Sequence, residues 1–369
     1  MSGAAAPDQT ISGATRARSA PRQIAGIQIL RALAALSVAF LHIEQSAGVF
    51  VGRVGESPWP WLRAIPWEAG VDMFFVISGF VMVYASDRLF RADGASRDFL
   101  SRRITRVVPL YWLFTTLTVL VAVVRPGLLN EPLGSGWDAV VASYLFIPWA
   151  RPDGFVQPVF RLGWTLNYEM LFYVIFTPFV MLTRRWAVLG VVAAIGALVV
   201  VGQLTWTGNT QIGFWTDPIV SEFAFGVLLG ALRLEGLQLS WPVRLGLIAA
   251  GLCIMLAVGV DDTQTRALSY GIPATCFVAA VSFGSGRAGT SLIARGALLL
   301  GDASYALYLV HLFPTRLLRE IWFRLHLTGT AGIVSFIAVS MAASCVVAVG
   351  VHVWVERPLV RSARRLLRA

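Results

Sequence analysis

Long apolar segments alternate along the chain with short polar segments that are rich in arginine. A helix of about 20 apolar residues crosses the roughly 30 Å hydrocarbon core of a bilayer. The pattern therefore predicts an all-α protein, a polytopic membrane bundle of about ten transmembrane helices. The segment 137–149 is apolar but too short to cross, so we expect it to be re-entrant or to lie at the interface. The expected spans are 27–49, 70–85, 107–124, 162–182, 186–204, 218–232, 243–259, 266–284, 297–314 and 329–354.

Arginine gives the orientation of these helices, because cytoplasmic loops carry an excess of positive residues. The richest basic segment is 88–106, and the C-terminal tail, 359–369, is also basic. Placing both segments in the cytoplasm puts both chain termini there. One arginine-rich loop after the ninth span would then face outward, unless that helix continues past Pro314.

Composition agrees with a membrane protein. The chain is 57% hydrophobic and only 14% charged. Its net charge of +10 follows from the same topology, so it does not indicate nucleic-acid binding. The three cysteines lie within apolar segments without metal-ligand spacing, so we expect neither a metal site nor a disulfide. Residues 1–24 lack the apolar core of a signal peptide, and we expect a disordered cytoplasmic tail before one transmembrane domain over 25–358.

Charged side chains within apolar segments are candidates for chemistry, because charge at bilayer depth is costly. Arg31 and His42 lie on the first expected helix, and Ser37 is the only polar side chain between them. Eleven residues at about 100° each bring the two to within roughly 20° of one another around the helix. A rise of about 1.5 Å per residue separates them by roughly 16 Å along it. A cation near one membrane surface and an imidazole near mid-bilayer therefore share one helix face.

Five further ionisable groups lie within the expected spans or near their ends. Some have a structural interpretation: Asp72 and Glu222 could cap their helices by accepting backbone N–H bonds, and His311 could hydrogen-bond a neighbouring helix. The arginines of 102–106 could bind a polyanion or act only as a topology signal. The five groups are Glu44, Asp72, Glu169, Glu222 and His311.

An imidazole between basic and acidic groups suits a general base near neutral pH. The layout would fit an enzyme that takes a phosphate-bearing donor from the cytoplasm and a hydroxyl acceptor from the other side. The alternative is a transporter or flippase in which buried carboxylates relay protons or ions. A sensory or scaffold protein is a third possibility.

Five segments, in order, resemble motifs of the acyltransferase-3 family of bacterial membrane O-acyltransferases. The resemblance extends over about residues 28–358. It is greatest to the exopolysaccharide acetyltransferase branch, because Asn167-Tyr168-Glu169-Met170 matches the motif of that branch. Thr165 stands where many members have serine. The five segments are 30–36 with His42, 70–80, 102–112, 164–169 and 301–311.

The resemblance implies a fold and a reaction. An acetyl or other acyl group would pass from cytoplasmic acyl-CoA to a hydroxyl of an exported polysaccharide or its lipid-linked precursor. The protein would lie among the lipids of the bacterial inner membrane, beside polysaccharide biosynthesis machinery, without a metal or a nucleic acid. Some relatives add a periplasmic hydrolase-like domain. This sequence stops at Ala369, so we expect it to complete the transfer itself or to pass the group to a partner.

The resemblance also assigns roles to residues. Arg31 and His42 would be the catalytic pair, with His42 as proton acceptor or acyl relay. Asp72 and Glu169 would orient His42 or the acceptor. The donor would be bound by Arg102, Arg103, Arg106, Ser304, Tyr308 and His311.

Overall fold

The computed structural model describes residues 24–59, 61–62, 65–124, 136–205, 208–258, 263–284 and 291–367. Its regular elements are helices, and one isolated antiparallel bridge joins Ala150 to Val156. The all-α prediction is confirmed for this part of the chain, and nearly all of the expected tail 1–24 lies outside it. The α-helices are α1 (Ala25–Ala47), α2 (Ala69–Ala85), α3 (Ala95–Val124), α4 (Gly136–Tyr144), α5 (Trp164–Phe179), α6 (Arg184–Leu204), α7 (Thr210–Trp215), α8 (Ser221–Leu234), α9 (Trp241–Ala257), α10 (Thr263–Arg266), α11 (Ile272–Ser282), α12 (Leu292–Asp302), α13 (Ser304–Val310), α14 (Leu312–Arg324), α15 (Gly329–Val351) and α16 (Arg357–Leu366).

Five helical segments of the described residues are long and apolar enough to cross a bilayer, or six if a bent pair counts as one span. The bent pair is α12 with α13, and the bend is 63°. Three further apolar helices are shorter: α2, α9 and Ala267–Ser282. A multi-pass membrane protein is therefore confirmed, whereas ten spans and cytoplasmic termini stay predictions. The five segments are Ala25–Val51, Ala95–Val124, Arg184–Leu204, Thr210–Leu234 and Gly329–Leu366.

Helix boundaries depart from the hydropathy pattern at three places. Helix α3 begins at Ala95, although only 107–124 is apolar, and Asp98 in its first turn complements the helix dipole. Helical structure also continues past Pro314, through α14. The segment 137–149 contributes only to the nine-residue α4, which is too short to cross. Because α3 begins at Ala95, the arginines of 102–106 lie on a helix and not in a loop.

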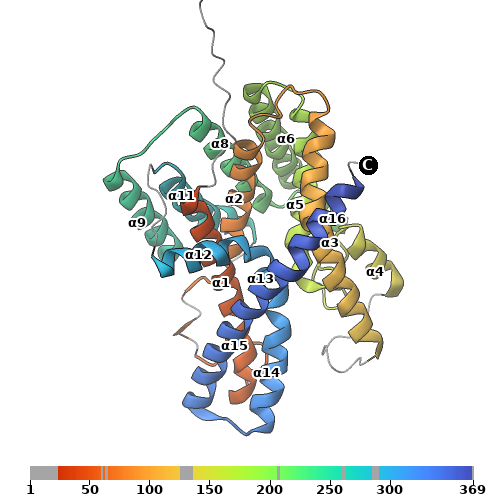
Figure 1. The fold of residues 1–369 in the computed structure, drawn as a ribbon, viewed down its shortest axis with the longest axis vertical. Helices are drawn as coiled ribbons and strands as arrows, with labels where there is room; N and C mark the ends of the chain where they lie inside the picture. The colour runs from red at the N-terminus through yellow and green to blue at the C-terminus, as the bar shows by residue number, and fades with distance from the viewer. Residues whose placement is uncertain are drawn as a thin grey trace, which may run out of the picture.

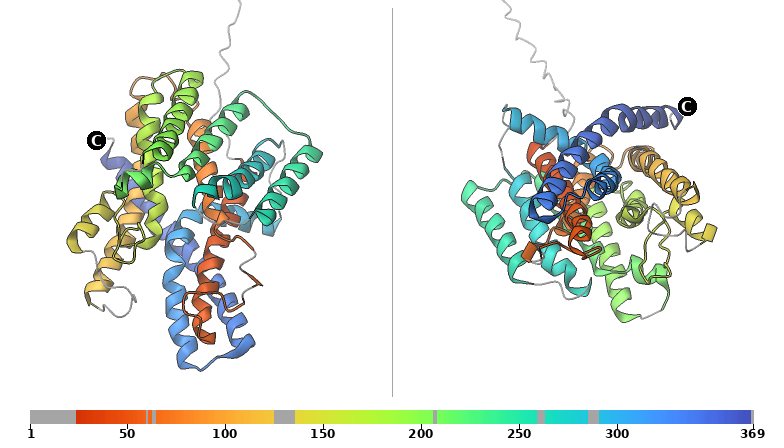
Figure 2. Two further views of the ribbon diagram at one scale, coloured as in Figure 1. Left: turned by 180° about the vertical axis from the view of Figure 1, so that it is seen from behind. Right: turned by 90° about the horizontal axis from the view of Figure 1, so that it is seen from below.

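Helices α2 and α8 pack closely, and glycines on both make this possible. A Cβ at Gly226 would lie 2.0 Å from the carbonyl oxygen of Val76, and a Cβ at Gly79 would lie 2.1 Å from that of Phe223. Small residues at such contacts let helix backbones approach in membrane proteins. Helix α1 contacts α2, and it also contacts α12, α13, α14 and α15, so it lies at the centre of the bundle (Figures 1 and 2).

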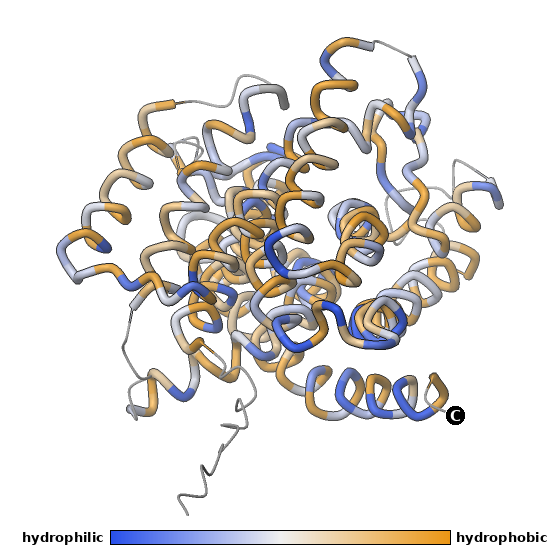
Figure 3. The backbone as a smooth tube through the Cα atoms, turned by 90° about the horizontal axis from the view of Figure 1, so that it is seen from above, coloured by the Kyte–Doolittle hydropathy of each residue, from blue (hydrophilic) through white to orange (hydrophobic). Residues whose placement is uncertain are grey.

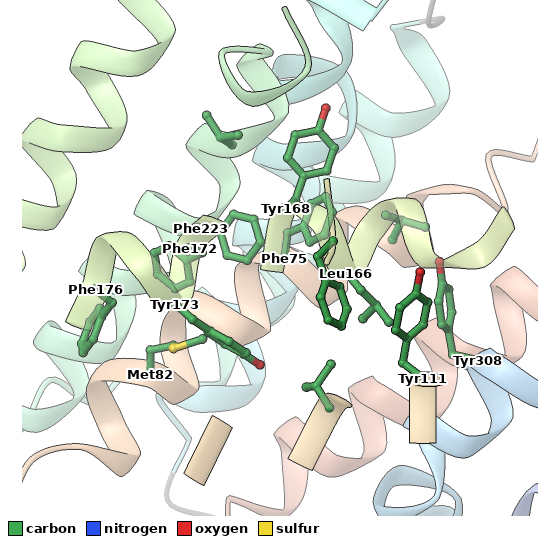
Figure 4. Close-up of a cluster of buried hydrophobic side chains, with 14 of the residues drawn as sticks. Phe75, Met82, Tyr111, Leu166, Tyr168, Phe172, Tyr173, Phe176, Phe223 and Tyr308 are labelled. Atoms are coloured by element: carbon green, nitrogen blue, oxygen red, sulfur yellow. The ribbon is translucent and has the colours of Figure 1, made fainter. Parts of the chain in front are cut away.

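Aromatic side chains fill the space between α2, α5 and α8. The ring of Phe223 stacks on Phe172 with centroids 4.5 Å apart and lies 4.7 Å from the ring of Phe75 (Figure 4). All three side chains are buried, and removing one such ring typically costs about 3–5 kcal/mol. This packing fixes α2 against α5, and both helices carry side chains of the pocket described below.

The outer helices expose large apolar side chains, as a surface facing lipid requires. Leu204, Val346 and Trp354 are each more than 70% exposed, at 79%, 72% and 78%. Helix α16 differs, because arginines alternate with apolar residues along it as it leaves the bundle (Figure 3). A basic amphipathic helix of this kind is typical of a membrane interface.

Candidate active site

A pocket of about 100 Å³ lies between α1, α2, α3, α5 and α13. Its apolar walls include Phe74, Phe75 and Leu166. Six of the ten predicted site residues line this pocket, although they come from four separate sequence motifs. The six are Arg31, Arg103, Arg106, Glu169, Ser304 and Tyr308.

Positive charge dominates the pocket. Three guanidiniums, from Arg31, Arg103 and Arg106, share it with the single carboxylate of Glu169. Among the described residues, no ion pair within 4.0 Å includes any of these three arginines. Guanidinium donors bind phosphate and carboxylate groups in bidentate geometry. The pocket is therefore suited to an anionic group with oxygen acceptors.

Glu169 is held in place by hydroxyl donors. The Ser78 hydroxyl donates to Glu169 Oε1 over 3.1 Å, and the Tyr173 hydroxyl donates to the same oxygen. Tyr173 follows Glu169 by four residues, so both lie on one face of α5. The carboxylate therefore has fixed partners in the protein and acts as a local countercharge to the arginines.

The arginine cluster at the start of α3 divides between two cavities. Arg103 and Arg106 are three residues apart, so they share a helix face, and both line the pocket. Arg102 points elsewhere: it pairs with Asp98 at 3.5 Å, its side chain is 52% exposed, and it lines a separate polar cavity of about 820 Å³ with Arg97 and Arg364. The arginines that were predicted to form one cluster therefore line two separate cavities, on adjacent faces of α3.

Helix α13 supplies three hydroxyl-bearing side chains to the pocket, Ser304, Tyr305 and Tyr308. The hydroxyl of Ser304 is buried and has no hydrogen-bond partner among the described residues. The hydroxyl of Tyr308 lies 2.9 Å from Thr165 Oγ1 and donates to the carbonyl of Leu162, also at 2.9 Å. The Tyr305 hydroxyl donates to the carbonyl of Val107. Ser304 is thus the one hydroxyl among these tyrosines and serine that is left to bond a ligand.

The two histidines lie beyond the pocket, next to its Tyr308 wall. His311 is fully buried on the α13–α14 junction, and its Nε2 lies 3.3 Å from Nδ1 of His42. The Tyr308 and His311 rings have centroids 6.5 Å apart. The sequence predicted Arg31 and His42 on one face of α1, and the structure places them at opposite ends of a row that passes Tyr308 and His311.

Asp72 lies in a different cluster. Its carboxylate binds Arg266 in bidentate fashion, with Nη2–Oδ2 at 2.7 Å and Nε–Oδ1 at 3.0 Å. The hydrogen-bond partners of His42 are Val38 and His311, so Asp72 is not the group that orients this imidazole. Glu222 is buried nearby. Arg266 stood at the edge of an expected span and was not anticipated as a partner for Asp72.

Some pocket residues were not selected from the sequence as site residues. Ser78 and Tyr305 fall within two of the five motif segments, so the resemblance already contained them. Tyr173 could have been found from its position four residues after Glu169. Within the described residues, no group of three or more His, Cys, Asp or Glu side chains could hold a metal ion.

Comparison with known proteins gives the following matches. Residues 24–349 match the family model of an acyltransferase domain. The chain is 33% identical over 304 residues to the exopolysaccharide production protein ExoZ of Rhizobium meliloti strain 1021, covering 80% of this chain and 90% of that protein.

Two more distant relatives are O-acetyltransferases by name. Identity is 24% to OatA of Staphylococcus aureus and 27% to the putative peptidoglycan O-acetyltransferase YrhL of Bacillus subtilis strain 168. Each match covers 79% of this chain, but only 50% of OatA and 48% of YrhL. No solved structure matches the chain.

Proposed function

The chain belongs to the acyltransferase-3 family and is a membrane O-acetyltransferase, and we propose that it moves an acetyl group from cytoplasmic acetyl-CoA to a hydroxyl of an exported polysaccharide or its lipid-linked precursor. The relative ExoZ, which matches over 90% of its length, is named as an exopolysaccharide production protein, and this name supports the acceptor class. The proposed location is the bacterial inner membrane, in contact with the machinery that assembles the polysaccharide.

One observation carries the donor assignment: three guanidiniums line the pocket together with a single carboxylate. Coenzyme A carries phosphates that such a set would bind through charge-assisted hydrogen bonds. A pocket of about 100 Å³ is much smaller than the roughly 300–1,000 Å³ of ordinary ligand sites, so it would take the thioester arm and an adjoining phosphate. The nucleotide end would lie in the outer polar cavity beside Arg97, Arg102 and Arg364.

The remaining predicted residues then have distinct roles. Ser304 would donate its unpartnered hydroxyl to the thioester arm, and Tyr308 would form the wall along which the acyl group passes towards His42. Glu169 would hold the arginine set in place as its countercharge. Asp72, bound to Arg266, would support the fold of α2 near the acceptor side.

The reaction is an acyl transfer with a general base. His42 accepts the proton of the acceptor hydroxyl as the oxygen attacks the thioester carbonyl carbon. The carbon–sulfur bond breaks, and the imidazolium returns the proton to the coenzyme A thiolate. The balanced products are the O-acetyl sugar and free coenzyme A.

Acetyl content of the exported polysaccharide tests this proposal. A deletion strain is complemented with the wild-type chain, with His42→Ala, or with the matched control His326→Ala, since His326 is exposed in the turn after α14. We expect wild type and the control to restore acetylation and His42→Ala to fail at equal membrane abundance. Full acetylation with His42→Ala would refute His42 as the base, and unacetylated glycan in the wild type would refute the acceptor class.

A further inference from the structure

Both histidines of the candidate site hydrogen-bond the carbonyl four residues earlier on their own helix. Nδ1 of His42 lies 2.9 Å from the Val38 oxygen, and Nδ1 of His311 lies 3.0 Å from the Leu307 oxygen. A carbonyl oxygen can only accept a hydrogen bond. Each Nδ1 must therefore carry a proton, which is a geometric assignment of the tautomer of each ring.

The contact between the rings agrees with this assignment. A neutral imidazole protonated on Nδ1 has a lone pair on Nε2. Nε2 of His311 lies 3.3 Å from Nδ1 of His42, so His311 accepts and the His42 N–H is shared between this nitrogen and the Val38 carbonyl. The ring centroids are 5.2 Å apart and the planes are tilted by 41°. Changing the tautomer of His42 alone would place two lone pairs against each other, and changing that of His311 alone would place two N–H hydrogens against each other.

Among the described residues, this arrangement leaves Nε2 of His42 as the free basic nitrogen. His42 is only partly buried, whereas His311 is fully buried and both of its nitrogens are occupied. His42 is therefore the ring that an acceptor hydroxyl can reach, and His311 can act only through His42.

We propose that His311 is a positioning residue that holds His42 in the Nδ1–H tautomer and stabilises the imidazolium formed during acyl transfer. The inference rests on the function proposed above. In familiar triads a carboxylate orients the catalytic histidine. Here a neutral imidazole takes that place, which avoids burying another charge in the membrane interior.

Nitrogen NMR measures the tautomer without depending on activity. The chain has only four histidines, so ¹⁵N-histidine-labelled protein in detergent gives few ring signals, which His42→Ala and His311→Gln assign. We expect His42 to show a protonated Nδ1 and an unprotonated Nε2. Finding Nε2–H on His42 would overturn the proposal.

Kinetics of three variants at position 311 test the role. Glutamine can place its amide oxygen near the original Nε2, while asparagine is as polar but too short, and leucine has no acceptor. We expect His311→Leu and His311→Asn to lower kcat about 10- to 100-fold, less than the roughly 10²- to 10⁴-fold contributed by a general base, with KM for acetyl-CoA unchanged. His311→Gln should recover most of kcat, and the exposed His326→Gln serves as the control.

The glutamine and asparagine variants keep the test decisive even if the leucine variant does not fold. Equal kcat in His311→Gln and His311→Asn would overturn the proposal, and so would a rise in KM without loss of kcat. A wild-type protein that transfers no acetyl group would instead refute the proposed function, while the NMR result would still decide the tautomer of His42.

Discussion

Replacing Arg106 by glutamine should weaken the use of acyl-CoA far more than the same change at Arg102, four residues earlier. Both are arginines at the start of α3, but Arg106 lines the inner pocket while Arg102 is 52% exposed and paired with Asp98. A hydrogen bond to a charged group contributes about 1.5–3 kcal/mol, so Arg106→Gln should raise KM for acetyl-CoA about 10- to 100-fold. Arg102 would contact the nucleotide end of acetyl-CoA from an exposed position, where an ion pair contributes about 0–1 kcal/mol, so Arg102→Gln should raise KM at most about 5-fold.

The assay is initial-rate acetyl transfer in proteoliposomes over a range of acetyl-CoA concentrations, at low and high salt. The Debye length falls from about 8 Å at 0.15 M to about 3 Å at 1 M, so the small effect of Arg102→Gln should vanish at high salt. The effect of Arg106→Gln should persist, because Arg106 is partly buried, where salt screens a charge less than at the surface. Equal KM values for the two variants, or a larger effect at Arg102, would refute the division of the cluster between two cavities.

The remaining predictions concern stability. Gly226→Ala should lower the unfolding temperature in detergent, because the added Cβ meets the Val76 carbonyl and overpacking costs about 1–3 kcal/mol; an unchanged temperature would contradict the close packing of α2 on α8. Asp72→Asn should destabilise the protein by about 3–5 kcal/mol by leaving the Arg266 charge unpaired, whereas Asp72→Leu with Arg266→Met should be milder. Thermal unfolding of the three proteins compares these changes, and a double variant less stable than Asp72→Asn would show that the ion pair is not the cause.

Local patterns in the sequence were enough to predict helices and one face of the site. Hydropathy identified a helical membrane protein, and the 3.6-residue period placed Arg31 and His42 on the same side of α1. The order of the motifs also anticipated six side chains that line one pocket. These features depend on residues that are close in sequence or on a resemblance to a whole family.

Contacts between distant segments could not be predicted in the same way. His42 and His311 are 269 residues apart, and Asp72 and Arg266 are 194 residues apart. No helical period relates such positions, so Asp72 was expected to orient His42 or the acceptor, and its ion pair with Arg266 was not foreseen. Hydropathy also does not detect the polar part of a helix. For this reason α3 was expected to begin at 107 and not at Ala95.

The most direct test of the central claim uses purified protein in liposomes, acetyl-CoA labelled in the acetyl group, and polysaccharide from a deletion strain as acceptor. The account predicts that label enters the polysaccharide as an alkali-labile ester with the wild-type chain, and that transfer falls about 10²- to 10⁴-fold with His42→Ala. Label that stays on coenzyme A with the wild-type chain, or transfer that is unchanged in His42→Ala, would contradict it.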